Sequence, residues 1–157
     1  RNRFLINNTD TMISVNIKKD SDYLNIVDRV ISDVWVFERK KTLNKVKESY
    51  RKAPYFKDVF PLLEDCLMNE ETNLFYFLLY SLNQVKDYLG IETKLVASST
   101  IDIDHNLKSE KKVIAICKKQ NSNYYINPIG GTTLYNKVDF KNSHSLFVYV
   151  DSGIILT

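Results

Sequence analysis

The chain has 157 residues, of which 44% are hydrophobic and 26% charged, a balance typical of a globular protein. Its net charge of +3 lacks the strong basic stripe of nucleic-acid-binding proteins, so we expect no nucleic-acid partner. No stretch approaches the roughly 20 apolar residues that span a bilayer, and no signal peptide is recognisable at the start. We therefore expect a cytoplasmic protein without a membrane span. We expect one domain over 1–157 that is a fragment of a longer chain, because the sequence starts at Arg1 and ends just after an apolar run.

The sequence shows no pattern typical of a metal or redox site. Its two cysteines, Cys66 and Cys117, have no Cys-x-x-Cys spacing and fall at apolar positions of predicted helices, so we expect buried free thiols. Asp102, Asp104 and His105 lie close together, but no further His or Cys cluster accompanies them. We expect neither a metal nor a cofactor.

The N-terminal portion is predicted to be rich in β-structure and is followed by two helices. Residues 11–18 alternate between apolar and polar side chains, which predicts a half-buried strand, and 23–31 is predicted to be a second extended segment. Apolar residues then recur at helical spacing over 38–50. Pro54 interrupts this helix, and a short helix is predicted over 57–68.

The clearest predicted helix covers residues 72–89. Thr72 is the expected N-cap and Gly90 sits where a C-terminal cap belongs. Leucines and other apolar residues occupy a wide arc of this helix: Leu74, Phe75, Leu78, Leu79, Leu82, Val85 and Leu89. An arc of this width predicts a helix that is covered on several sides by the core.

The second half of the chain decides the predicted fold class. Strands are predicted over 93–97, 124–126 and 146–150, with a helix beginning at Ser109 and a short helix over 132–136 between them. This alternation favours parallel strands joined by right-handed crossovers. We expect an α/β fold with a three-layer, mostly parallel sheet, flanking helices and the N-terminal β-rich portion.

Two loops follow predicted strands, where open α/β sheets bind ligands. Ser98 and Ser99 offer hydroxyl groups to phosphate or sugar oxygens. Gly130 and Gly131 allow close backbone approach, and the helix that starts near Thr132 would direct its free N–H groups at an anion. Both loops are predicted at the same edge of the sheet. The alternative for each is a plain turn with a helix cap.

A third candidate segment combines cations with aromatic rings around Pro54. Arg51 or Lys52 would bind phosphate, and Tyr55 would stack on a base or sugar. The alternative is a helix terminus with solvated lysines and aromatic residues of the core.

The order of several short motifs resembles the WbqC-like proteins. These motifs are Asn2-Arg3, residues 50–56, residues 88–93, Ser98-Ser99, Glu110 with residues 116–118, and residues 125–135. The resemblance implies a bacterial cytoplasmic protein that is encoded with surface-polysaccharide genes and modifies sugars for O-antigen or capsule. It suggests an acyl or aminoacyl transfer onto a nucleotide-linked amino sugar. Family members usually carry a preceding segment with a Gln-x-x-Tyr-x-Pro motif, and this chain begins just after it.

On this hypothesis the protein is a transferase with a phosphate-bearing small-molecule ligand. Its proposed ligand-binding residues are Arg3, Lys52, Tyr55, Ser98, Ser99, Gly130, Gly131, Thr132 and Tyr135. Glu110 is the candidate catalytic base. The alternative is a non-catalytic binding or assembly protein of the same pathway, because no nucleophile motif or cofactor fingerprint is recognisable. A homodimer through exposed strand edges is a further expectation.

Overall fold

The computed structural model describes residues 2–6, 9–128 and 146–150. The chain separates into two compact units, Arg1–Thr93 and Lys94–Thr157, and each is described by itself. That the whole chain forms one domain stays a prediction.

The first unit begins with a β-hairpin. Strands β1 (Asn2–Ile6) and β2 (Thr9–Ile13) pair antiparallel, with Phe4 opposite Thr11. Because side chains alternate along a strand, Phe4, Thr11 and Ile13 are half-buried, whereas Leu5 and Met12 point outward and are about half exposed. The hairpin therefore contributes one apolar face to the unit.

The sequence placed the N-terminal strands only in part. The strand predicted over 11–18 ends at Ile13, and beyond it Ile17 forms only an isolated bridge with Ile31. The extended segment predicted over 23–31 is wrong in its middle, where a 3-10 turn, η1 (Ile26–Asp28), replaces it. The backbone N–H of Ile31 instead donates to the carbonyl of Thr72 at 2.7 Å. The residues of this segment form isolated backbone hydrogen bonds with other segments. They therefore do not form a continuous strand ladder.

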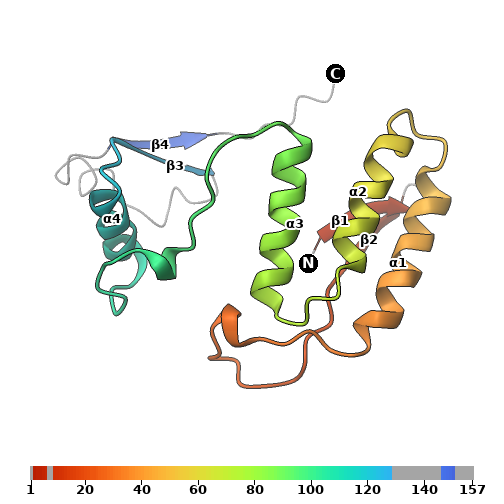
Figure 1. Ribbon diagram of the computed structural model, residues 1–157, viewed down its shortest axis with the longest axis horizontal. Coiled ribbons are helices and arrows are strands. Elements are labelled where there is room, and N and C mark those ends of the chain that lie inside the picture. Colours follow the sequence, from red (N-terminus) through yellow and green to blue (C-terminus); the bar gives the residue numbers. More distant parts are fainter. Residues whose placement is uncertain (1, 7–8, 129–145, 151–157) are drawn as a thin grey trace. The chain divides into compact units, whose positions relative to one another are not determined.

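Three helices follow and run alternately up and down (Figure 1). They are α1 (Trp35–Tyr50), α2 (Phe56–Met68) and α3 (Leu74–Tyr88), and α2 contacts both of the others. The three predicted helices are confirmed, although α1 starts earlier than predicted because Trp35 packs into the core.

The core of this unit is small. Trp35 and Phe77 are 3% and 2% exposed, and their rings meet edge to face at 6.3 Å, with Ile31 beside them. Phe77 is the buried residue of α3, while Leu82 and Leu89 are 59% and 60% exposed. The prediction that α3 is covered on several sides is therefore wrong. The apolar arc of this helix is wider than the one face that packs against the core.

Polar groups close the ends of these helices. Asn73, not the predicted Thr72, is the N-cap of α3, because its side-chain oxygen accepts from the backbone N–H groups of Phe75 and Tyr76 at 3.0 and 3.3 Å. Gly90 has φ +65° and ends the helix as predicted. At the end of α2, the buried Arg39 donates from Nη1 to the carbonyls of Met68 and Asn69 at 3.1 and 2.9 Å.

The second unit contains a helix and a parallel pair of strands. Helix α4 (Ser109–Lys119) is followed by β3 (Tyr124–Pro128), which pairs in parallel with β4 (Leu146–Val150). These three elements are confirmed. A short 3-10 turn, η2 (Ser98–Thr100), precedes them.

The strand predicted over 93–97 is wrong. Residues 94–97 form no strand with any part of the chain that the structure describes, and Leu95 and Val96 are 43% and 47% exposed. Their β-branched and apolar side chains favour extended backbone, but a strand also needs a neighbour with free N–H and C=O groups. The described strands form two separate two-stranded sheets, so a mixed helix and strand fold is confirmed but a three-layer parallel sheet is not.

Both cysteines are buried and free, as predicted. Burial raises the pKa of the Cys66 thiol, which also contacts Ser81, and burial raises the pKa of the Cys117 thiol as well. Within the described ranges, no helix has the length and apolar character required to cross a membrane.

Candidate functional site

The first unit contains an open cavity of about 400 Å³ between the hairpin, the end of α1, the 51–55 turn and α2. This volume falls within the range of small-molecule sites. Most of the wall is carbon, contributed mainly by aromatic and aliphatic side chains: Phe4, Val46, Tyr50, Phe56, Phe60 and Leu63.

Helical spacing places these side chains on one wall. Phe56, Phe60 and Leu63 are four and three residues apart, so they share a face of α2. The rings of Phe56 and Phe60 stack at 4.8 Å with an interplanar angle of 25°. On α1, Tyr50 joins the helix to the hairpin, since its Oη accepts from the backbone N–H of Leu5 at 3.0 Å. These residues form part of the cavity wall.

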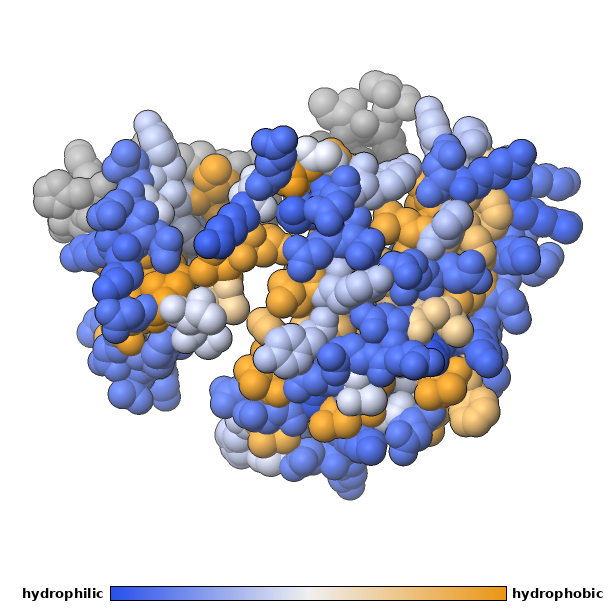
Figure 2. All heavy atoms as spheres, viewed as in Figure 1, coloured by the Kyte–Doolittle hydropathy of each residue, from blue (hydrophilic) through white to orange (hydrophobic). Residues whose placement is uncertain are grey.

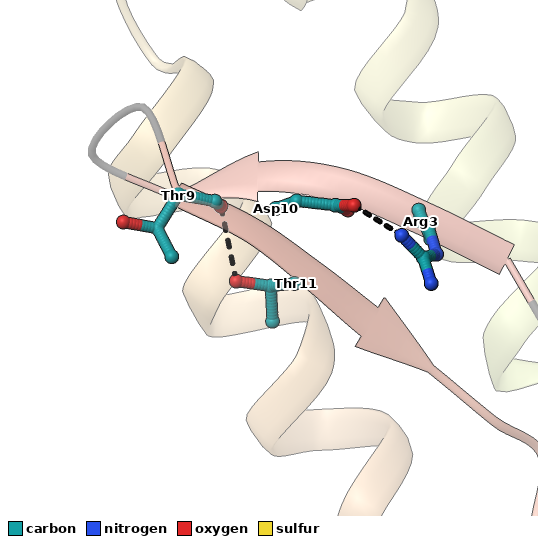
Figure 3. Close-up of polar contacts among 4 residues, drawn as sticks. All are labelled: Arg3, Thr9, Asp10 and Thr11. Carbon is teal, nitrogen blue, oxygen red and sulfur yellow. Dashed lines mark hydrogen bonds and ion pairs between the residues drawn. The ribbon is translucent and has the colours of Figure 1, made fainter.

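Positive charge lies at the rim of the cavity. Arg3 lines it and forms an ion pair with Asp10 across the hairpin, with its side chain 64% exposed (Figure 3). Arg51 and Lys52 are exposed in the turn whose next residues line the cavity. Tyr55 lines the cavity and is 73% exposed. The structure thus brings Arg3 and Tyr55 to one cavity, while Lys52 lies in the adjoining turn.

The second unit holds the other described candidates. Ser98 and Ser99 are exposed in η2, and Thr100 Oγ1 donates back to the carbonyl of Ala97 at 2.8 Å. They follow no strand of the described chain, so the prediction that this loop lies at a strand end is wrong. Glu110 is half-buried in the first turn of α4. Gly130, Gly131, Thr132 and Tyr135 lie outside the described residues.

In the segment from Asp102 to His105, Asp102 forms an ion pair with Lys119. Lys119 donates to Asp102 Oδ2 at 2.7 Å, and this hydrogen bond and positive charge lower the pKa of the Asp102 carboxyl. Across the described residues, no three His, Cys, Asp or Glu side chains gather in a way that would hold a metal ion.

A comparison of the sequence with protein families places this geometry in context. The model of the WbqC-like protein family matches residues 1–155. The chain belongs to the WbqC-like protein family. No curated protein and no solved structure matches it. In this WbqC-like protein the motif around Pro54, which carried part of the resemblance, forms one wall of the cavity.

The sequence did not predict most of the residues that form the cavity wall of this WbqC-like protein. The spacing of Phe56, Phe60 and Leu63 predicts an apolar helix face, but such a face usually packs into a core. Sequence reasoning also missed Arg39, which lies among the lysines of α1 and reads as a solvated cation. Only the tertiary structure shows that Arg39 is 7% exposed and that the aromatic face of α2 borders open space.

Proposed function

We propose that this WbqC-like protein modifies a nucleotide-linked amino sugar by acyl or aminoacyl transfer, and that the cavity of the first unit binds substrate. Family membership supports the sugar-modifying role through the resemblance described above. The observation that carries the proposal is the cavity itself, an aromatic pocket lined by one cation, Arg3, which pairs with Asp10, while Arg51 and Lys52 are exposed in the adjoining turn. Such a combination suits a ligand that carries both a ring and a phosphate group.

The rim residues have complementary roles in this proposal. The exposed ring of Tyr55 stacks on the nucleobase. Arg3 offers a planar, permanently charged fork to the diphosphate, and Asp10 keeps that fork at the rim. Lys52 adds a second positive charge from the exposed turn. Together these groups would recognise the charged part of the substrate.

Glu110, Ser98 and Ser99 are separate candidates for the transfer step and are proposed from the sequence alone. The sugar amine attacks the carbonyl carbon of an activated acyl group, and the activating group leaves with the electron pair of the bond that breaks. Glu110 accepts the proton that the amine loses. Ser98 and Ser99 offer hydroxyl groups to the sugar. Replacing Glu110 with Gln is expected to stop turnover and to leave substrate binding unchanged.

Thermal unfolding in the presence of ligands tests the binding proposal. A panel of nucleotide sugars, free nucleotides and simple phosphates is titrated, and unfolding of the first unit is followed by the fluorescence of Trp35, the single tryptophan of the chain. A ligand that binds only the folded state at a hundredfold excess over its dissociation constant stabilises it by about 2.7 kcal/mol.

The matched variants are Lys52→Ala at the rim and Lys45→Ala, an exposed lysine of α1 that does not line the cavity. Lys52→Ala is expected to reduce the shift caused by a nucleotide sugar, and Lys45→Ala is expected to leave it unchanged. The absence of a shift from every ligand at millimolar concentration would contradict the proposal.

The second candidate function, a non-catalytic binding or assembly protein, is favoured by the outer face of α3. Leu78, Leu82, Val85 and Leu89 recur at helical spacing and are 38 to 60% exposed. Figure 2 shows such apolar side chains scattered over the viewed face. If this face joins two copies of the chain, Leu82→Glu will convert a dimer to a monomer in light scattering. A monomeric wild-type chain would exclude that role for the face.

A further inference from the structure

The interior of the cavity differs in chemistry from its rim. Among the described residues that line it, Arg3 is the one charged side chain. The Tyr50 hydroxyl oxygen accepts the N–H of Leu5, and its O–H is the one side-chain donor that Tyr50 can offer. Ala53, Val59 and Leu63 contribute only carbon from their side chains. The inner wall therefore offers little to a polar ligand.

This wall disfavours a sugar or a phosphate inside the cavity. Either group would leave water and find few hydrogen-bond partners, and unpaired polar groups are costly to bury. An apolar group, in contrast, gains from leaving water and from contact with the stacked rings of Phe56 and Phe60. The interior thus selects for hydrocarbon, while the rim selects for negative charge.

We infer that the cavity binds the hydrocarbon chain of an acyl substrate, with the charged end of that substrate at the opening beside Arg51. This inference rests on the proposed acyl transfer and names the class of group that is transferred, a medium-length fatty acyl chain. Charge complementarity supports it, because Arg51, which the nucleotide-sugar proposal does not use, is exposed in the turn that adjoins the cavity.

The size of the cavity sets the expected chain length. A water molecule occupies about 30 Å³ in the liquid, and a methylene group is of similar size. The cavity of about 400 Å³ therefore admits a chain on the order of ten carbons. Longer chains would extend into solvent and gain little.

A chain-length series tests this directly. The dissociation constants of hexanoate, octanoate, decanoate, dodecanoate and tetradecanoate are measured by calorimetry below their micelle concentrations. Burial of each methylene is expected to tighten binding by about fourfold until the cavity is full, after which the affinity levels off. An affinity that does not depend on chain length would overturn the inference.

Two valines of equal exposure provide matched variants. Val59 lines the cavity and Val85 lies on the outer face of α3, and both are 43% exposed. Val59→Asp is expected to weaken decanoate binding by at least tenfold, whereas Val85→Asp leaves it unchanged. The reverse result would place the fatty acid on α3 and overturn the inference.

A third variant gives a readout that misfolding cannot imitate. Val59→Phe reduces the free volume, so the affinity should level off at a shorter chain while hexanoate still binds. An unchanged plateau would also contradict the inference.

Nucleotide-sugar binding, measured on the same samples, separates this inference from the proposed function. If a nucleotide sugar binds and decanoate does not, the acyl-chain inference fails and the sugar-modifying role stands. If neither binds, both fail. If decanoate binds with the expected chain-length dependence and no nucleotide sugar does, the cavity assignment stands and the sugar substrate is wrong.

Discussion

The two ends of helix α1 differ in how their aromatic residues are used. At its start, Trp35 is 3% exposed and meets Phe77 in the core, beside a smaller pocket of about 250 Å³ that Ile31, Trp35 and Arg39 line. At its end, Tyr50 borders a cavity of about 400 Å³ together with Phe56 and Phe60. The same class of side chain is thus almost fully buried at one end and borders a larger cavity at the other.

This difference separates stability from binding. A filled core gains dispersion contacts and excludes water, so each of its atoms contributes to the free energy of unfolding. A cavity wall forgoes some of those contacts and keeps apolar surface available to a ligand. The two ends of α1 should therefore respond differently to mutation.

Truncation of one phenylalanine at each end should give unequal losses of stability. Phe77→Ala is expected to lower the free energy of unfolding by about 3–5 kcal/mol, because Phe77 is 2% exposed and its removal leaves a void. Phe60→Ala should cost roughly half as much, since Phe60 is half-buried and borders open space. Denaturant unfolding followed by Trp35 fluorescence measures both. Equal losses would mean that the cavity end is packed as tightly as the core.

Arg39 is buried near the start of α1, and we expect it to contribute to stability as well. Arg39→Ala removes two hydrogen bonds from a charged donor to the carbonyls that end α2, at a cost of about 2–3 kcal/mol. Lys40→Ala is the control, because Lys40 is exposed on the same helix. The same unfolding assay applies. A loss no larger than that of Lys40→Ala would show that the end of α2 does not need this cap.

The N-cap of α3 gives a smaller effect at the same end. Asn73→Ala is expected to cost about 1 kcal/mol, because two N–H groups lose their acceptor. Thr72→Ala should change stability by far less, since the Thr72 side chain is exposed and only its backbone carbonyl is used. Amide hydrogen exchange in the first turn of α3 reports the effect locally. Faster amide exchange in Thr72→Ala than in Asn73→Ala would mean that Thr72, as the sequence predicts, is the N-cap of α3.

The exposed pair Asp102–Lys119 in the second unit extends the comparison to the surface and should have the smallest effect. Lys119 lowers the pKa of Asp102, so the pair stabilises the fold above the ordinary carboxyl pKa of about 4. This contribution is lost as the pH falls through the lower pKa of the folded state. In an NMR titration, Lys119→Met should raise the pKa of Asp102 towards its ordinary value. A pKa that does not respond would show that the pair is not populated in solution.

The helices of this protein could be predicted because their information is local. The spacing of apolar residues, Pro54 after α1 and Gly90 after α3 each act within a few residues, and the structure confirms the three helices that they delimit. The strand predicted over 93–97 failed because its local preference for extended backbone found no partner among the described residues. Arg3 and Tyr55 were found through their chemistry, whereas Phe60 and Leu63 looked like ordinary core residues.

Residue types at short spacing predict the helical segments and the buried thiols of Cys66 and Cys117, and the order of motifs along residues 1–155 identifies the family. Only the tertiary structure decided that Asn73 caps α3, that Arg39 is buried at the end of α2, and that the aromatic face of α2 borders a cavity. The physical reason is that a short-range pattern specifies which face of a helix is apolar. What covers that face, and whether anything does, depends on residues far away in the chain.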